Sequence, residues 1–169
     1  MIPFPNSGAT DLDPFQGGKH FQKQWNRTNL IFCTKGGARK MDKTKNKIIV
    51  ADDDFDMRGV VIDSLRDSFD GFEFIQAPDG ETVLKLLQEN EGQVALVFTD
   101  NTMYPGMGGL ELSKKISQLG LNIPVIMLAG VDADSAFTTQ LKEASVTAFL
   151  LKPPDLNRLI ETAKALIEK

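Results

Sequence analysis

The sequence predicts an α/β fold in which one five-stranded parallel sheet is covered by helices on both faces. Two observations carry this prediction. Short, continuous apolar runs alternate along the chain with segments of helical periodicity, and charged residues directly follow several of these runs. Strands of a parallel sheet are buried on both faces, so they contain near-continuous apolar residues instead of an alternating pattern. Because a helix connects each pair of strands, right-handed crossovers within a doubly wound sheet are expected.

Each expected strand is a short apolar run bounded by turn-forming or charged residues. The sequence Pro78-Asp79-Gly80 forms a turn after the second run, Thr99 and Asp100 end the third, and Pro124 introduces the fourth. The runs that satisfy this description are residues 48–51, 72–77, 94–98, 125–128 and 148–151.

Each expected helix is recognised by apolar residues that recur three or four positions apart, which places them on one face. Five segments show this spacing, and one follows each expected strand. In chain order, their apolar residues are Met57, Val60, Val61, Ile62 and Leu65; Val83, Leu84, Leu86 and Leu87; Leu110, Leu112, Ile116 and Leu119; Phe137, Leu141 and Ala144; and Leu156, Leu159, Ile160, Ala163, Leu166 and Ile167.

Residues 1–46 are expected to form a flexible basic tail in front of the folded domain, which covers residues 47–169. The tail is rich in Gly, Pro, Asn and Thr and shows no sustained period of 2 or 3.6, and residues 30–33 are its one strand-like piece. Met41 lies six residues before Lys47, where the first strand approaches. It is an alternative start of translation, in which case the residues before it are a mis-assigned extension.

Charge is divided unevenly between the two parts. Residues 1–47 carry nine Lys/Arg and three Asp/Glu, a net charge of +6, whereas residues 48–169 carry ten and twenty, a net charge of −10. Phosphates repel an acidic domain, so direct binding of DNA by the folded part is not expected. The chain has a single cysteine, Cys33, and neither a secretory signal nor an apolar stretch of the ~20 residues that a membrane helix needs. A cytoplasmic protein without membrane contact is therefore expected.

Charged residues gather at the ends of three expected strands. Asp52, Asp53 and Asp54 follow the first strand, Asp100 ends the third, and Lys152 follows the fifth. In such sheets ligands bind at the carboxyl ends of the strands. Carboxylates that meet there repel one another unless a cation neutralises them, and a hard divalent ion such as Mg²⁺ prefers oxygen ligands. The lysine adds a point charge suited to phosphate.

Each of these residues also has an ordinary explanation when it is taken alone. The acidic run can cap the next helix, because Asp is favoured at the N-cap, and Asp54 or Phe55 is expected to begin that helix. A single Asp100 or Lys152 is more often a solvated loop residue. The three positions together, at the ends of strands one, three and five, favour a functional site.

The same three segments resemble the receiver domain of bacterial response regulators. They are Lys-Ile-Ile-Val-Ala-Asp-Asp-Asp at 47–54, Leu-Val-Phe-Thr-Asp at 96–100 followed by Pro-Gly-Met-Gly-Gly-Leu-Glu-Leu at 105–112, and Phe-Leu-Leu-Lys-Pro at 149–153. The resemblance covers residues 47–169. It implies a flavodoxin-like fold with strand order 2-1-3-4-5.

The resemblance also implies a role for each matching residue. Asp100 corresponds to the aspartate that accepts the phosphoryl group, Asp53 to the direct Mg²⁺ ligand, and Asp52 to a partner that acts on the metal through water. Lys152 corresponds to the lysine that contacts the phosphoryl group. Phe149 corresponds to the aromatic switch residue, for which a plain core position is an equally good interpretation.

Two features depart from the family pattern. Pro105 lies five residues after Asp100 instead of four, as if one residue were inserted, which leaves open a register with Asn101 at the acceptor position and puts in doubt the loop carbonyl that ligates Mg²⁺. Asp100 is preferred because residues 96–99 then align with the third strand. After the fourth strand, Ala129 stands where receivers carry the Thr or Ser hydroxyl that grips the phosphoryl oxygen.

The leading hypothesis is a stand-alone receiver that is phosphorylated on Asp100 with Mg²⁺ by a histidine kinase or phosphotransfer protein, and that signals through protein contacts. It acts on no other substrate, and the residues after Lys152 are expected to form only one last helix. The alternative is a pseudo-receiver that binds partners independently of phosphorylation, as Ala129 and the longer loop suggest. A nucleotide-binding enzyme is disfavoured, since no Gly-rich phosphate loop follows the first strand and His20 lies in the tail.

Overall fold

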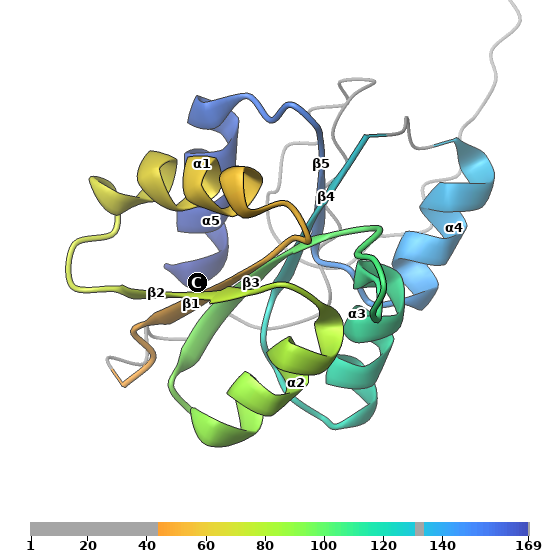
Figure 1. Cartoon of the computed structure of the whole chain (residues 1–169), viewed down its shortest axis with the longest axis horizontal. Coiled ribbons are helices and arrows are strands. Elements are labelled where there is room, and N and C mark those ends of the chain that lie inside the picture. Colours follow the sequence, from red (N-terminus) through yellow and green to blue (C-terminus); the bar gives the residue numbers. More distant parts are fainter. Residues whose placement is uncertain (1–43, 131–133, 169) are drawn as a thin grey trace, which may run out of the picture.

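The computed structural model describes residues 44–130 and 134–168, in which strands and helices alternate strictly along the chain (Figure 1). The strands are β1 (Lys47–Ala51), β2 (Glu73–Ala77), β3 (Val94–Asp100), β4 (Val125–Ala129) and β5 (Ala148–Leu151). The helices are α1 (Phe55–Arg66), α2 (Gly80–Glu89), α3 (Gly109–Gln118), α4 (Ser135–Glu143) and α5 (Leu156–Ile167). No helix of the described ranges is long and apolar enough to cross a membrane.

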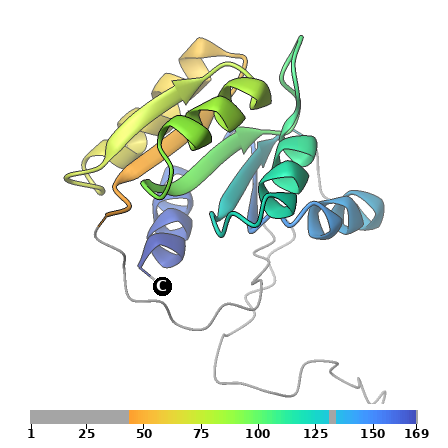
Figure 2. The same ribbon diagram turned by 90° about the horizontal axis from the view of Figure 1, so that it is seen from below.

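The five strands form one parallel sheet in the order β2-β1-β3-β4-β5, which confirms the predicted fold class and strand order. Helices α1 and α5 lie on one face, and α2, α3 and α4 lie on the other (Figures 1 and 2). The chain reverses its direction of strand addition between β1 and β3. The carboxyl ends of these two strands therefore border the crevice in which doubly wound sheets bind their ligands.

The centre of the sheet is buried on both faces, as the continuous apolar runs predict. All seven residues of β3 are buried. Alternate side chains of the strands point to opposite faces, so Leu96 and Phe98 pack with α1 and α5, whereas Val97 packs with α2 and α3. A third cluster under α4 contains Met127 and Phe149. Because helices cover both faces of the sheet, polar side chains of a functional site are expected at the strand ends.

Aspartate side chains cap four of the described helices. Asp54, Asp79, Asp134 and Asp155 each accept a hydrogen bond from a backbone N–H in the first turn of α1, α2, α4 and α5. The prediction that Asp54 or Phe55 begins the first helix is confirmed, since Asp54 is the N-cap and Phe55 the first helical residue. The carboxylate of Asp54 is thus engaged in capping, which separates it from Asp52 and Asp53.

The predicted strand bounds agree with the structure to within one residue at most ends, and the third strand extends through Thr99 to Asp100. The predicted tail, with Met41 and residues 30–33, lies outside the described residues except for residues 44–46. Its flexibility therefore stays a prediction.

Burial of the inner face of α5 should contribute strongly to stability. Leu159 is fully buried among the residues of β3 and α1, whereas Leu156, three positions earlier on the same helix, is 46% exposed. We expect Leu159→Ala to lower the free energy of unfolding by about 2–5 kcal/mol, because it removes buried methyl groups and leaves a cavity. Leu156→Ala is the matched control and should cost less than ~1 kcal/mol. Urea denaturation of both variants measures the difference, and equal losses would contradict the assigned faces of α5.

Candidate functional site: an acidic cluster at the carboxyl edge of the sheet

The polar residues predicted from three strand ends meet at the carboxyl edge of the sheet. The register pairs Ala51 of β1 with Thr99 of β3, so that Asp52 lies beside Asp100. Lys152 follows β5 directly, and its backbone N–H donates to the carbonyl of Ala129 at the end of β4 (2.9 Å). The long Lys152 side chain then extends back to the two carboxylates. Three positions that are far apart in the sequence thus form one site.

The ammonium group of Lys152 joins the two buried carboxylates of the site. Its Nζ lies 2.6 Å from Oδ2 of Asp52 and 2.9 Å from Oδ1 of Asp100. Asp52 is 3% exposed and Asp100 is 8% exposed, so both carboxylates are largely removed from water. Such groups require a charged partner, and this lysine is shared between them.

Every polar group of Asp52 has a hydrogen-bond partner. Its backbone N–H donates to the carbonyl of Ala77 (3.2 Å), and its carbonyl accepts from Nη1 of Arg58 (2.6 Å). In the side chain, Oδ1 accepts from the N–H of Asp54 (2.9 Å) and Oδ2 accepts from Lys152 (2.6 Å). With both oxygens engaged, Asp52 is better suited to hold a bound water than to ligate a metal directly.

Asp100 is oriented by one hydrogen bond on each carboxylate oxygen. Oδ1 faces Lys152, and Oδ2 accepts from the backbone N–H of Thr102 (3.1 Å). Asn101, the other candidate for the acceptor position, continues the pairing with β4 through its N–H to the carbonyl of Leu128 (3.0 Å). The structure therefore brings Asp100, and not Asn101, into contact with the lysine of the cluster.

Asp53 completes the cluster from the solvent side. It is exposed, and its Oδ2 accepts from the backbone N–H of Tyr104 (3.1 Å), whereas Oδ1 accepts no hydrogen bond within the described part of the chain. One carboxylate oxygen from each of Asp52, Asp53 and Asp100 lies within 4.8 Å of the others. Oxygen ligands at this spacing, open to water on one side, fit a hard divalent cation such as Mg²⁺.

Burial and hydrogen bonding shift the pKa values of two groups in the cluster, Asp52 and Lys152. Burial raises the pKa of Asp52 above its ordinary value of 3.8, although hydrogen bonds from Lys152 and the N–H of Asp54 oppose this effect. Burial also lowers the pKa of Lys152, but hydrogen bonds to Asp52 and Asp100 outweigh it, and the net pKa is raised above 10.5.

The sign of each shift decides its effect on stability. Folding favours the protonated form of both groups, so each stabilising contribution is present at low pH and is lost as pH rises through the folded pKa. For Lys152 that loss falls above pH 10.5, so the charged lysine stabilises the fold at neutral pH. For Asp52 the loss falls above pH 3.8, and once it is ionised the buried carboxylate opposes folding. A bound cation would offset this opposition.

The loop between β3 and α3 is anchored on both sides. Met103 and Met107 are buried, and Met107 exchanges hydrogen bonds with the start of α2: its N–H donates to Glu81 (2.7 Å) and its carbonyl accepts from the N–H of Gly80 (3.0 Å). Near the acidic cluster, Gly108 lies so close to the carbonyl of Asn101 that a Cβ would stand 2.5 Å from it. The longer loop is thus held in place, and it presents the N–H of Tyr104 to Asp53.

The two predicted switch positions lie in the core beside the cluster. Ala129 ends β4 and is 1% exposed. Phe149 of β5 is also 1% exposed and packs edge-to-face on Phe137 of α4, with ring centroids 5.7 Å apart. Both therefore belong to the cluster of buried residues under α4, and the ring of Phe149 points inward.

Two residues that contact the site were not predicted from the sequence. Arg58 reaches the carbonyl of Asp52, and Tyr104 holds Asp53 through its backbone. The contact of Arg58 could have been predicted from its position one turn after the N-cap Asp54, because a side chain there can reach back to the preceding loop. The contact of Tyr104 depends on the path of the loop, and nothing in the sequence pattern indicates it.

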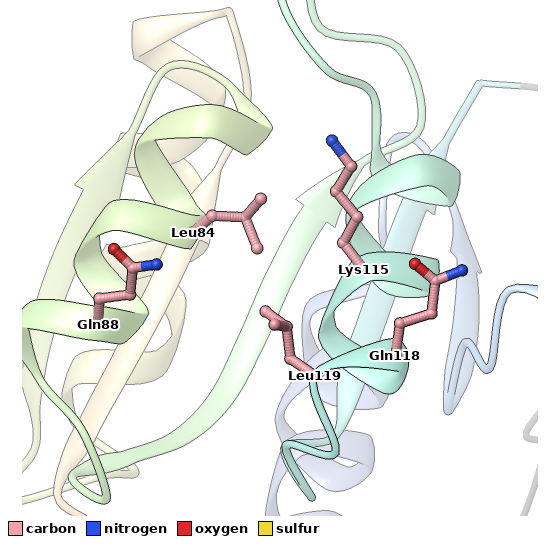
Figure 3. A pocket seen from close by; sticks show the side chains of 5 residues that line it. All are labelled: Leu84, Gln88, Lys115, Gln118 and Leu119. Atoms are coloured by element: carbon pink, nitrogen blue, oxygen red, sulfur yellow. The ribbon is translucent and has the colours of Figure 1, made fainter.

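An open groove between α2 and α3 lies away from the cluster (Figure 3). Both helices run from the carboxyl edge of the sheet towards the opposite edge, and the groove lies near their C-terminal ends. Its lining offers one charged group, Lys115, and no carboxylate; the residues are Leu84, Gln88, Lys115, Gln118 and Leu119. The groove therefore has no part in the chemistry of the acidic cluster.

A doubly wound parallel sheet with paired aspartates, a buried strand-end aspartate and a lysine at one edge defines the phosphoryl-receiver class of signalling modules. The chain belongs to the response regulator receiver domain family of two-component systems, whose family pattern matches residues 48–164.

Individual relatives agree with this assignment. "Response regulator MprA" of Mycobacterium sp. (strain KMS) is 29% identical over 123 residues, covering 73% of this chain and 51% of that protein. "Uncharacterized transcriptional regulatory protein YbdJ" of Bacillus subtilis (strain 168) is 34% identical over 124 residues, with shares of 72% and 51%. The chain thus spans about half the length of these relatives. Among solved structures, the receiver domain of NtrX from Brucella abortus superposes with a TM-score of 0.63 at 28% identity, covering 72% of this chain and 98% of that one.

Neutralising Asp53 should have opposite effects with and without Mg²⁺. We expect Asp53→Asn to raise the stability of the metal-free protein by about 0.2–1 kcal/mol, because it removes one of three crowded charges while its amide oxygen still accepts from Tyr104. The same variant should lose the stabilisation that millimolar-range Mg²⁺ gives to the wild type. Melting temperatures at several Mg²⁺ concentrations test both parts. Asp63→Asn, on the exposed face of α1, is the control and should respond to Mg²⁺ like the wild type. An unchanged Mg²⁺ response in Asp53→Asn would show that the ion binds elsewhere.

Proposed function

We propose that this receiver accepts a phosphoryl group on Asp100 in a Mg²⁺-dependent reaction and passes the signal on through protein contacts. The observation that carries the proposal is the shared lysine: Nζ of Lys152 lies within 3 Å of both Asp52 and Asp100, at the point where the three carboxylates meet. A structural ion pair needs only one carboxylate. Two carboxylates that share one lysine, with the carboxylate of Asp53 beside them, form a site for a cation and a phosphoryl group.

The proposed step is an in-line displacement at phosphorus. An oxygen of Asp100 forms a bond to phosphorus while the bond between phosphorus and the imidazole nitrogen of a phosphohistidine breaks, and the electron pair of that bond stays on the nitrogen. The N–H of Thr102 keeps the carboxylate oriented. Lys152, already 2.9 Å from Asp100, donates to an oxygen of the incoming group. Asp53 and Asp100 would hold Mg²⁺, with Asp52 acting through water, and the ion would supply neutralisation of the phosphoryl charge.

The surroundings of the site favour a macromolecular phosphodonor, as expected of a histidine kinase or phosphotransfer protein. Exposed large apolar side chains stand near the strand ends: Phe55 is 67% exposed at the start of α1, Tyr104 83% in the β3–α3 loop, and Leu156 46% at the start of α5. Apolar side chains around a polar centre are typical of protein contact sites. Small phosphodonors would reach Asp100 through the same opening.

The pseudo-receiver remains the second candidate, and Ala129 is the observation that favours it. The side chain of Ala129 has no hydroxyl to bind a phosphoryl oxygen, and Phe149 is buried without one. Signalling through the face formed by α4 and β5 would then be independent of phosphorylation. The acceptor, the acidic pair and the lysine oppose this reading, because a constitutive module has no need of the costly carboxylate cluster.

Treatment with a small phosphodonor tests the acceptor directly. With acetyl phosphate and Mg²⁺, the wild type should gain one phosphoryl group, measured by intact mass. Asp100→Asn, which keeps the shape but not the nucleophilic carboxylate, should gain none, and Asp63→Asn should react like the wild type. An adduct that persists in Asp100→Asn would point to another acceptor. A wild type that gains no adduct would favour the pseudo-receiver.

Replacing Ala129 tests the coupling between the site and Phe149. A hydrogen bond to a charged group contributes about 1.5–3 kcal/mol, so its absence weakens the shift towards the active state by roughly ten- to a hundredfold. We expect phosphorylation to change the NMR shifts around Phe149, α4 and α5 only slightly in the wild type and more strongly in Ala129→Thr. A full, saturating shift in the wild type would mean that Thr102 or a backbone group replaces the hydroxyl.

A further inference from the structure

Arg58 makes three contacts that connect α1 with the ends of two strands. Its Nη1 donates to the carbonyl of Asp52 (2.6 Å), and its Nε donates to Oε1 of Gln76 in β2 (3.0 Å). The guanidinium carbon also lies 5.3 Å from the ring centroid of Phe55, within cation–π range. A planar guanidinium with three fixed contacts has little freedom to move. Arg58 therefore holds the carbonyl of Asp52 in one place.

The carbonyl held by Arg58 belongs to the peptide between the two acidic residues. The N–H of Asp52 is fixed by Ala77 and its side chain by Asp54 and Lys152, so the carbonyl is the last polar group whose direction is open. Fixing that carbonyl fixes the plane of the peptide bond. That plane contains the amide nitrogen and the Cα of Asp53, so it places the backbone atoms from which the Asp53 side chain extends. Arg58 thus acts on the exposed carboxylate of the cluster without contacting it.

If Arg58 acted only through its positive charge, it would weaken the binding of a metal ion instead of supporting it. A guanidinium close to a cation site repels the cation, so removal of the positive charge should tighten Mg²⁺ binding. Loss of a positioning contact should weaken binding, because groups that orient metal ligands typically contribute 10- to 100-fold in affinity. The two effects differ in sign, and the sign of the change in affinity identifies which one dominates.

We infer that Arg58 is a positioning residue of the acidic site, which orients the Asp52–Asp53 peptide for cation binding and is itself held by Gln76 and Phe55. The inference rests on the proposed Mg²⁺ site. It gives α1 a part in positioning the site at the strand ends. The side chain of Arg58 extends from the helix back to the loop that precedes it. Arg58 is not a catalytic residue, since it contacts the carbonyl of Asp52, Gln76 and Phe55 and not the reacting atoms.

The test compares Mg²⁺ dissociation constants, measured by calorimetry, in the wild type and four variants of the full chain. Arg58→Ala should bind about tenfold more weakly. Arg58→Lys keeps the charge, but its ammonium group lacks the fork that reaches Asp52 and Gln76 together, so it should restore only part of the affinity. Gln76→Ala removes one support of the guanidinium and should give a smaller loss in the same direction. Arg66→Ala removes the same charge from the exposed end of α1 and should leave the affinity unchanged or slightly higher.

Each outcome has a definite meaning. Equal or tighter Mg²⁺ binding by Arg58→Ala overturns the inference while the proposed function stands. Full recovery in Arg58→Lys overturns the part assigned to the guanidinium fork and to Gln76, because an ammonium group cannot reach Asp52 and Gln76 together. A wild type that binds no Mg²⁺ overturns both the inference and the proposed function. Melting temperatures without metal separate positioning from general stability: a lower value with an unchanged dissociation constant also counts against the inference. If Arg58→Ala does not fold, Gln76→Ala and Arg58→Lys decide the question by the same comparison.

Discussion

The bridge from Lys152 to Asp52 and Asp100 is the interaction on which the rest of the site depends. Two carboxylates at the ends of neighbouring parallel strands are brought together by the sheet itself, and burial makes their charges costly. One ammonium group within hydrogen-bond distance of both keeps them in place without cancelling their combined charge. The bridge therefore keeps the carboxylates in place, while the site still carries a net negative charge. The remaining negative charge favours a cation, which would in turn neutralise the charge of an incoming phosphoryl group.

The groups around this bridge orient the carboxylates through backbone contacts. The carboxylate of Asp52 is held by the N–H of Asp54, that of Asp100 by the N–H of Thr102, and that of Asp53 by the N–H of Tyr104. Backbone donors are well suited to this purpose because their positions follow from the path of the chain and carry none of the rotational freedom of a side chain. The additional residue of the β3–α3 loop is accommodated here, since the buried side chains of Met103 and Met107 anchor the loop on both sides of Tyr104.

The buried cluster under α4 includes Ala129, whose side chain lacks the hydroxyl that receivers carry at this position. Phe149 is buried against Phe137 beside Ala129, a packing that apolar contact alone maintains. In a receiver with a hydroxyl at the end of β4, inward packing of this ring and binding of the phosphoryl group would be connected. Here the ring lies inward and the hydroxyl is absent. Under the proposed function, the absence of this hydroxyl is expected to weaken the coupling between chemistry at the strand ends and the conformation of α4.

The sequence by itself determined the order of the elements, the sheet and the identity of the cluster. Continuous apolar runs predict parallel strands because both faces are buried, and residues after such strands converge at one edge, so Asp52, Asp53, Asp100 and Lys152 were predictable. Only the tertiary structure decided which oxygen faces which donor. The contacts of Arg58 and Tyr104 depend on a helix start and a loop path, which are fixed by packing far along the chain and leave no periodic signal. The inward position of Phe149 likewise depends on Phe137, a neighbour that only the docking of α4 supplies.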